Sequence, residues 1–271
     1  MRRYWVAKED IDLAATPALV HLHGEVLHHI RDVCRMRIQD RFEVLSDEQK
    51  AYLVEIVSET KNESVAKIIE TRVIEPIAKP HIVLALSIPR FNVFENIIEK
   101  SVELGVHSIQ PLFSDFSFIR KQEDVLEKKM QRFQKIIQGA TQQSGRGDFM
   151  PILPALTLQE MLSNFNLERQ NASLIPGSFV SGIFAFEGES EASFKSYLHE
   201  ILQNFRNAQE NQKIYVFVGS EGGFSTKEVE MFKKYSLKPV TLGTQVLRVE
   251  TACVALVSVI KYELNSRHQP S

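Results

Sequence analysis

The chain has 271 residues, of which 44% are hydrophobic and 24% charged, and its formal net charge is -2. This length allows a sizeable core that needs neither disulfides nor metals, and these fractions are typical of a globular protein. The small net charge excludes a histone-like or tail-type mode of nucleic-acid binding, but it leaves room for a local basic patch.

The positions of the cysteine, histidine and apolar residues argue against a metal site, a disulfide framework and a membrane span. The two cysteines, Cys34 and Cys253, lack the spacing of a zinc site or of a disulfide framework. His28 and His29 have no third metal ligand at a usable spacing. No stretch approaches the roughly 20 apolar residues of a membrane helix, and no apolar run of signal-peptide length precedes Lys8. We therefore expect a cytoplasmic protein with free thiols, no metal and no membrane partner.

Strand patterns dominate residues 1–75. Residues 3–6 are β-prone, residues 42–57 form a hairpin pattern around a polar turn, and residues 65–73 continue the strand character. One helix is expected between them, over residues 25–33. The pattern predicts a small β-rich module or barrel.

Pro76 and Pro80 mark a domain boundary, after which apolar strand runs alternate with amphipathic helices. We expect strands near 82–86, 108–113, 183–186, 214–218 and 240–242, and helices near 93–104, 124–143, 194–205, 227–234 and 251–264. Residues 164–181 are polar and are expected to be an irregular loop. The alternation predicts that residues 76–271 form an α/β domain with a mostly parallel sheet.

Glycine-bearing loops follow two of these strands. One is Val218-Gly-Ser-Glu-Gly-Gly-Phe-Ser, in which Gly222 and Gly223 permit close approach of a ligand, and Ser225 with Glu228 predicts a capping box. The other is Leu242-Gly-Thr-Gln-Val-Leu-Arg-Val-Glu-Thr-Ala. The strand end at Ala185-Phe-Glu-Gly is less distinctive. Ligands bind beyond the carboxyl ends of parallel strands, although each loop alone also fits an ordinary tight turn.

The composition of these loops limits the ligand. Neither a dinucleotide motif nor a P-loop motif occurs. The loops lack Lys and offer backbone groups, apolar side chains and Arg248. This set suits an adenosine with a zwitterionic tail better than a triphosphate.

Two basic segments could contact phosphates. Residues 28–41 contain four arginines, and residues 120–148 contain seven basic residues against four acidic ones. For the second segment, the solvated face of an amphipathic helix is the favoured explanation of the charges.

Taken together, six segments resemble the motifs of the small-subunit ribosomal RNA uridine-N3 methyltransferases, knotted SPOUT-class enzymes with a PUA-like N-terminal barrel. They are Arg3-Tyr-Trp-Val, His29-Ile-Arg-Asp-Val-Cys-Arg-Met, Glu99-Lys-Ser-Val-Glu-Leu-Gly-Val, Ala140-Thr-Gln-Gln-Ser-Gly-Arg and the two glycine-bearing loops. The chain departs from the motifs in places: Ser220 replaces Pro, Gln142 replaces Glu, Gln39 falls where Gly is common, and Asp115-Phe-Ser replaces Glu-Arg-Ser.

The resemblance implies an α/β domain with a C-terminal trefoil knot after the barrel, a homodimer, and methyl transfer from S-adenosylmethionine to N3 of a uridine in 16S ribosomal RNA. The terminal helix, apolar nearly all round, also favours a dimer. A non-catalytic RNA- or ribosome-binding protein and a ribose 2′-O-methyltransferase are the alternatives.

The same resemblance assigns candidate site residues. The expected cofactor ligands are Val218, Gly219, Glu221, Gly222, Leu242, Gly243, Leu247, Arg248, Thr251 and Ala252. The expected RNA contacts are Arg3, His29, Arg35 and Arg37 on the barrel. Arg146 and Arg248 are expected to stabilise negative charge on the target uracil, and because Gln142 replaces a carboxylate, no general base is assigned.

Overall fold

The computed structural model describes residues 1–119, 123–188, 194–205 and 211–265. The chain divides into two compact units. Unit 1 comprises Met1–Pro76 and Gln138–Phe149, and unit 2 comprises Ile77–Ile137 and Met150–Ser271. A segment from the middle of the chain thus joins the N-terminal module.

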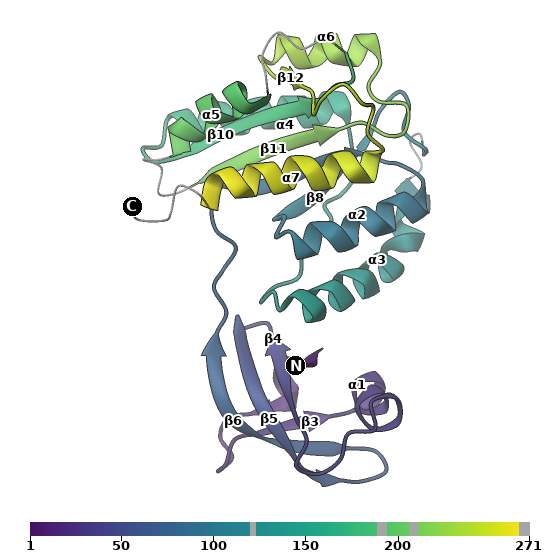
Figure 1. Cartoon of the computed structure of the whole chain (residues 1–271), viewed down its shortest axis with the longest axis vertical. Helices are drawn as coiled ribbons and strands as arrows, with labels where there is room; N and C mark the ends of the chain where they lie inside the picture. The colour runs from purple at the N-terminus through teal and green to yellow at the C-terminus, as the bar shows by residue number, and fades with distance from the viewer. Residues whose placement is uncertain (120–122, 189–193, 206–210, 266–271) are drawn as a thin grey trace. The chain divides into compact units, whose positions relative to one another are not determined.

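Unit 1 is built on a curled six-stranded sheet (Figure 1). Its strands are β1 (Arg3–Trp5), β2 (Ile11–Asp12), β3 (Leu19–Leu22), β4 (Arg41–Ser46), β5 (Lys50–Glu59) and β6 (Ser64–Val73), in the order β1-β4-β5-β6-β3-β2. β1 pairs with β4 in parallel, and the other pairings are antiparallel. Alternating apolar residues, including Phe42, Val44, Val54 and Ile56, point into one buried core.

The helix expected over residues 25–33 is present in two parts. A short α-helix, α1 (Gly24–His28), continues into a π-helical turn over His29–Val33. Ile30 in this turn is buried in the core of unit 1. The wider turn brings the backbone N–H of Cys34 to the carbonyl of His29 at 2.9 Å.

Unit 2 contains the expected parallel sheet. Its strands are β7 (His81–Ser87), β8 (Ser108–Phe113), β9 (Leu156–Thr157), β10 (Phe179–Ala185), β11 (Gln212–Val218) and β12 (Lys238–Val240), in the order β12-β10-β11-β7-β8-β9. The strand pairings within it are parallel. The central strands are apolar on both faces because helices cover both.

The helices of unit 2 are α2 (Phe91–Glu103), α3 (Glu123–Ser144), α4 (Leu158–Ser173), α5 (Phe194–Asn204), α6 (Thr226–Lys234) and α7 (Val249–Asn265), and the last turns of α3 belong to unit 1. α4 and α6 bury Phe165 and Phe232 against Phe217 of the sheet. α7 contacts β11 and α2, and Figure 1 shows α2 and α7 on the same side of the sheet. No helix within the described residues is both long and apolar enough to span a membrane.

The expectation of an irregular loop over residues 164–181 was wrong, because α4 runs to Ser173. Thr157 and Glu160 form a capping box that starts this helix before the polar segment. Leu158, Met161, Leu162 and Phe165 are buried at helical spacing. The polar residues that follow continue the helix instead of ending it, because propensity is a weak guide once packing sets the helix.

Candidate functional site

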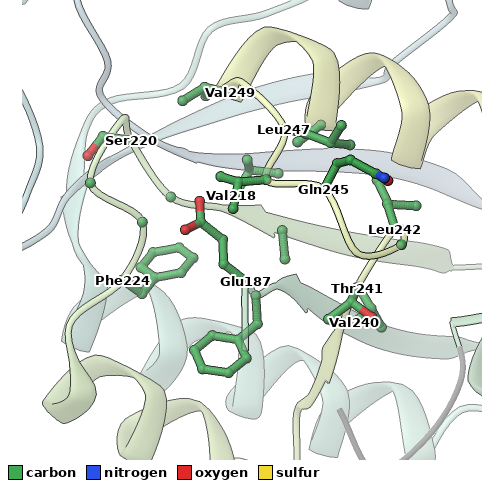
Figure 2. A pocket seen from close by; sticks show the side chains of 18 of the residues that line it. Glu187, Val218, Ser220, Phe224, Val240, Thr241, Leu242, Gln245, Leu247 and Val249 are labelled. Carbon is green, nitrogen blue, oxygen red and sulfur yellow. The ribbon is translucent and has the colours of Figure 1, made fainter. Parts of the chain in front are cut away.

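A cavity of about 160 Å³ lies at the carboxyl ends of β10, β11 and β12 (Figure 2). Because these strands are neighbours and parallel, the three loops that leave them meet at one edge of the sheet. The lining comprises Ala185, Phe186, Glu187, Val218, Gly219, Ser220, Gly222, Gly223, Phe224, Val240, Thr241, Leu242, Gly243, Thr244, Gln245, Val246, Leu247, Val249 and Ala252.

Two glycines fix the shape of the loop after β11. A Cβ at Gly219 would lie 2.6 Å from the carbonyl carbon of Gly223, so a side chain there would collide with backbone. Gly223 has φ +68°, in the left-handed region that glycine favours. Its N–H donates to the carbonyl of Ser220 at 2.9 Å and closes the turn. The loop therefore presents bare backbone to the cavity.

The expected capping box is present and is also linked to the loop after β8. The hydroxyl of Ser225 accepts from the N–H of Glu228 at 3.3 Å, and the Glu228 carboxylate accepts from the N–H of Ser225 at 2.8 Å. The same carboxylate accepts from the N–H of Asp115 at 2.9 Å, and the hydroxyl of Ser225 donates to the Asp115 carboxylate. Asp115, a departure from the family motif, thus ties the loop after β8 to the start of α6.

Ser220 and Gly222 make two further contacts with the loop after β8. The hydroxyl of Ser220, which stands where the motif has Pro, donates to the carbonyl of Phe116 at 2.6 Å. A Cβ at Gly222 would lie 3.0 Å from the Cβ of Phe116. The hydrogen bond from Ser220 to Phe116 therefore restrains this loop at the position where the motif has proline.

Most of the expected cofactor residues gather at the cavity. Val218, Gly219, Gly222, Leu242, Gly243, Leu247 and Ala252 line it, whereas Glu221, Arg248 and Thr251 lie outside the lining. The Glu221 carboxylate accepts the N–H of Arg90, at the start of α2, at 3.1 Å. Arg248 and Thr251 are exposed at the start of α7.

Glu187, an important side chain of the lining, was not predicted as a site residue from the sequence. Glu187 is the single charged residue among the described residues that line the cavity. Figure 2 shows its side chain extending between Phe224 and Val218. The sequence signal was the strand end Ala185-Phe-Glu-Gly, which carries one glycine and resembles many turns. With Arg248 outside, the cavity has an acidic and not a basic wall, which disfavours a phosphate ligand.

The expected RNA-contacting residues lie in unit 1 but differ in their surroundings. Arg35, with φ +55°, and Arg37 are exposed. His29 is exposed, and its Nδ1 lies 3.1 Å from the hydroxyl of Tyr4 and 3.4 Å from the Sγ of Cys34. Burial and the hydrogen bond with Cys34 raise the pKa of Tyr4 above its ordinary value.

Arg3 forms an internal ion pair. Its Nε donates to Glu43 at 2.7 Å, and Arg72 donates to the other oxygen of that carboxylate at 2.7 Å. A second N–H of Arg3 donates to the carbonyl of Gln143 at 2.9 Å. Burial alone would raise the pKa of Glu43, but the hydrogen bonds from Arg72 and Arg3 outweigh it and hold the pKa below its usual range.

Arg146 is buried in unit 1, with 5% of its side chain exposed. Its Nε donates to the carboxylate of Asp148 at 2.7 Å, and a second N–H approaches the other oxygen at 3.3 Å. No general base was assigned from the sequence, because Gln142 replaces a carboxylate. In the structure, a different carboxylate, that of Asp148, lies directly against Arg146.

Residues 77–261 match the model of the RNA methyltransferase domain, and residues 22–69 match the RNA methyltransferase PUA domain. Ribosomal RNA small subunit methyltransferase E of Mesomycoplasma hyopneumoniae is 30% identical over 86% of this chain and 89% of its own. The Bacillus subtilis protein of the same name is 26% identical over 97% of each chain. A crystal structure of the Neisseria gonorrhoeae protein of that name, bound to S-adenosyl methionine, is 23% identical with a TM-score of 0.75, covering 97% of this chain and 98% of its own.

Proposed function

The chain belongs to the RNA methyltransferase family, and from this premise we propose that it transfers the methyl group of S-adenosylmethionine to N3 of a uridine in 16S ribosomal RNA. Two curated relatives that match nearly the whole chain are named as methyltransferases of small-subunit ribosomal RNA. The choice of uridine N3 follows the motifs of Arg3, His29 and the two glycine-bearing loops.

The character of the cavity carries the proposal. S-adenosylmethionine has an apolar-faced adenine, a sulfonium, an ammonium and a carboxylate, so its net charge is positive. The cavity offers apolar side chains for the adenine, backbone groups of the lining residues Gly219, Gly223 and Gly243, and one carboxylate, Glu187. These features fit a cationic adenosine derivative and oppose a nucleoside triphosphate. When bound, the cofactor supplies an electrophilic methyl group, so no metal is required.

The nucleophile determines the rest of the chemistry. N3 of uridine carries a proton, which leaves as the N3–methyl bond forms and the carbon–sulfur bond breaks; the products are 3-methyluridine, S-adenosylhomocysteine and a proton. Because N3 lies on the Watson–Crick edge, the base must be unpaired when it reacts. The protein therefore has to position the base and stabilise its anion.

Arg248 and Arg146 are the proposed cations for that anion. Arg248 is exposed beside Leu247 and Val249, which line the cavity. Arg146 is held by Asp148 in a fixed orientation, which suits a preorganised donor. Neither guanidinium can take the proton, because Arg stays protonated.

Residues 1–75, which belong to unit 1, are the proposed RNA-binding module, and residues 76–271 are the proposed methyltransferase domain. His29, Arg35 and Arg37 are all exposed, and the two arginines supply positive charge. Arg3 contributes through its exposed fraction of 30%, while its ion pair with Glu43 holds it in place. The match of residues 22–69 to an RNA methyltransferase PUA domain supports this division.

A homodimer in the cytoplasm, with the C-terminal trefoil knot, completes the proposal. On α7, Val254, Ala255, Val259 and Tyr262 stay partly or largely exposed within one chain, although Leu256 and Ile260 on its other side are fully buried. Such an uncovered apolar surface on a helix is typical of a subunit interface.

Methyl transfer to intact small ribosomal subunits tests the proposed function. Purified protein is incubated with isotopically labelled S-adenosylmethionine and subunits that lack the modification, and digested RNA is analysed by mass spectrometry. We expect label in 3-methyluridine at one site. Label in a 2′-O-methylated ribose would replace the assignment of the base, and absence of label despite subunit binding would indicate a non-catalytic RNA-binding protein.

A further inference from the structure

We propose that the ring of Phe116 is the stacking platform for the target nucleobase in this protein. This inference rests on the proposed function and extends it to the residue that receives the base. Phe116 is an exposed aromatic residue in the loop after β8, and an aromatic ring can stack on an unpaired base.

The position of Phe116 supports this role. Its side chain lies next to Gly222, a residue of the cavity lining. A Cβ placed on Gly222 would lie 3.0 Å from the Cβ and 3.1 Å from the Cγ of Phe116. Phe116 does not itself line the cavity, and 47% of it is exposed. A base placed on this ring would therefore lie next to the rim of the cofactor cavity.

The turn that carries Phe116 is rigid. Ser114 and Ser117 are buried, the N–H of Ser114 donates to the hydroxyl of Ser117 at 3.2 Å, and that hydroxyl lies 2.9 Å from the carbonyl of Ser114. The tether from Ser220 holds the carbonyl of Phe116, and the Asp115–Glu228 bond holds the preceding residue. A large apolar side chain is thus exposed on a fixed backbone, so the turn loses little conformational entropy when a ligand binds.

Phe118 provides a natural contrast two residues away. It is slightly more exposed, at 55%, and its ring packs edge-on against Phe91 with the centroids 5.9 Å apart. Phe118 is neither among the residues that line the cavity nor among the nearest neighbours of the missing Cβ of Gly222. It therefore serves as a matched control for the loss of an exposed phenyl ring from the same turn.

The test compares Phe116→Ala, Phe116→Tyr and Phe118→Ala in the full-length protein. Stacking on an aromatic side chain predicts that Phe116→Ala raises the KM for small subunits by about 10- to 100-fold. In calorimetry, the affinity of Phe116→Ala for S-adenosylmethionine should stay within about twofold of the wild-type value. For Phe118→Ala, both the KM for small subunits and the cofactor affinity should stay within about twofold of wild type. Phe116→Tyr keeps a stacking ring and should restore most of the activity.

Several results would overturn the inference. They are an unchanged KM in Phe116→Ala, an equal effect of Phe118→Ala, or a loss of cofactor affinity in Phe116→Ala, which would assign the ring to loop packing. A change in oligomeric state by light scattering would assign it to a subunit interface. If the wild-type protein transfers no methyl group, the proposed function itself fails; normal transfer by both wild type and Phe116→Ala rejects the stacking role alone.

Discussion

At the scale of single residues, Glu43 shows how a buried carboxylate organises unit 1. Arg3 and Arg72 reach it from β1 and β6, and 6% of its side chain is exposed. Removing a partner from a charged hydrogen bond costs about 2 kcal/mol. We expect Glu43→Gln to lower the free energy of unfolding by about that amount at neutral pH, measured by urea titration with the fluorescence of Trp5, the single tryptophan.

The pH dependence of this effect has a defined sign. The pKa of Glu43 is lower in the folded than in the unfolded state. The contribution of Glu43 to the free energy of unfolding is therefore complete above its pKa in the unfolded state, about 4.3 for Glu. This contribution is lost as the pH falls through the pKa of the folded state. The difference in stability between wild type and Glu43→Gln should shrink in acid. A difference that is constant or grows as the pH falls would contradict this view of Glu43.

The exposed arginines of unit 1 give a second prediction at this scale. Arg35 and Arg37 are exposed, so the double charge reversal to Glu should weaken RNA binding. The slope of log affinity against log salt should flatten by about one unit per lost phosphate contact. Cofactor affinity should not change. Lys234→Glu, an exposed cation on α6 of unit 2, is the control. Unchanged RNA affinity and salt slope in the double variant would remove unit 1 from the RNA-binding surface.

These residues also show what the sequence could and could not predict. Arg3 belongs to a recognisable motif, but its partner Glu43 lies forty residues away on another strand. The ion pair could therefore not be predicted from the sequence. Glu187 was missed because its strand end has no distinctive spacing. Phe116 was noticed as a departure from a motif, but its contact with Gly222 depends on two loops that meet only in the fold.

At the scale of elements, the strand-end loops were predictable because glycines and caps are local signals, whereas the extent of α4 was not. Its polar second half resembles a loop, and it is helical because its first half packs against the sheet. The capping boxes of α4 and α6 have the same pattern, Thr157 with Glu160 and Ser225 with Glu228. They differ in that the box of α6 follows a loop that lines the cavity.

This likeness provides a matched pair of variants. Ser225→Ala and Thr157→Ala should each lower the free energy of unfolding by about 1 kcal/mol, the usual cost of losing an N-cap. Only Ser225→Ala also removes the link to Asp115, and it alone should weaken the binding of S-adenosylmethionine in calorimetry. Equal cofactor affinities in the two variants would show that the cap does not hold the cavity loop.

At the scale of the whole molecule, the apolar surface of α7 predicts the assembly. The terminal helix was expected to be buried on several sides, and within one chain Val259 and Tyr262 remain 37% and 71% exposed. Light scattering should give twice the chain mass of 31.0 kDa. Val259→Glu should shift the protein towards the monomer, whereas Leu167→Glu, on the exposed side of α4, should not. A monomeric wild-type protein at micromolar concentration would reject the dimer.

The central claim is that the three loops at the ends of β10, β11 and β12 form the cofactor site, and calorimetric titration with S-adenosylmethionine tests it most directly. Ala252 lines the cavity, whereas Ala14 is exposed in unit 1 and is not part of the lining. We predict binding to wild type and to Ala14→Leu, and loss of binding in Ala252→Leu with the fold retained by circular dichroism. Equal binding by wild type and both variants, or none by the folded wild-type protein, would contradict it.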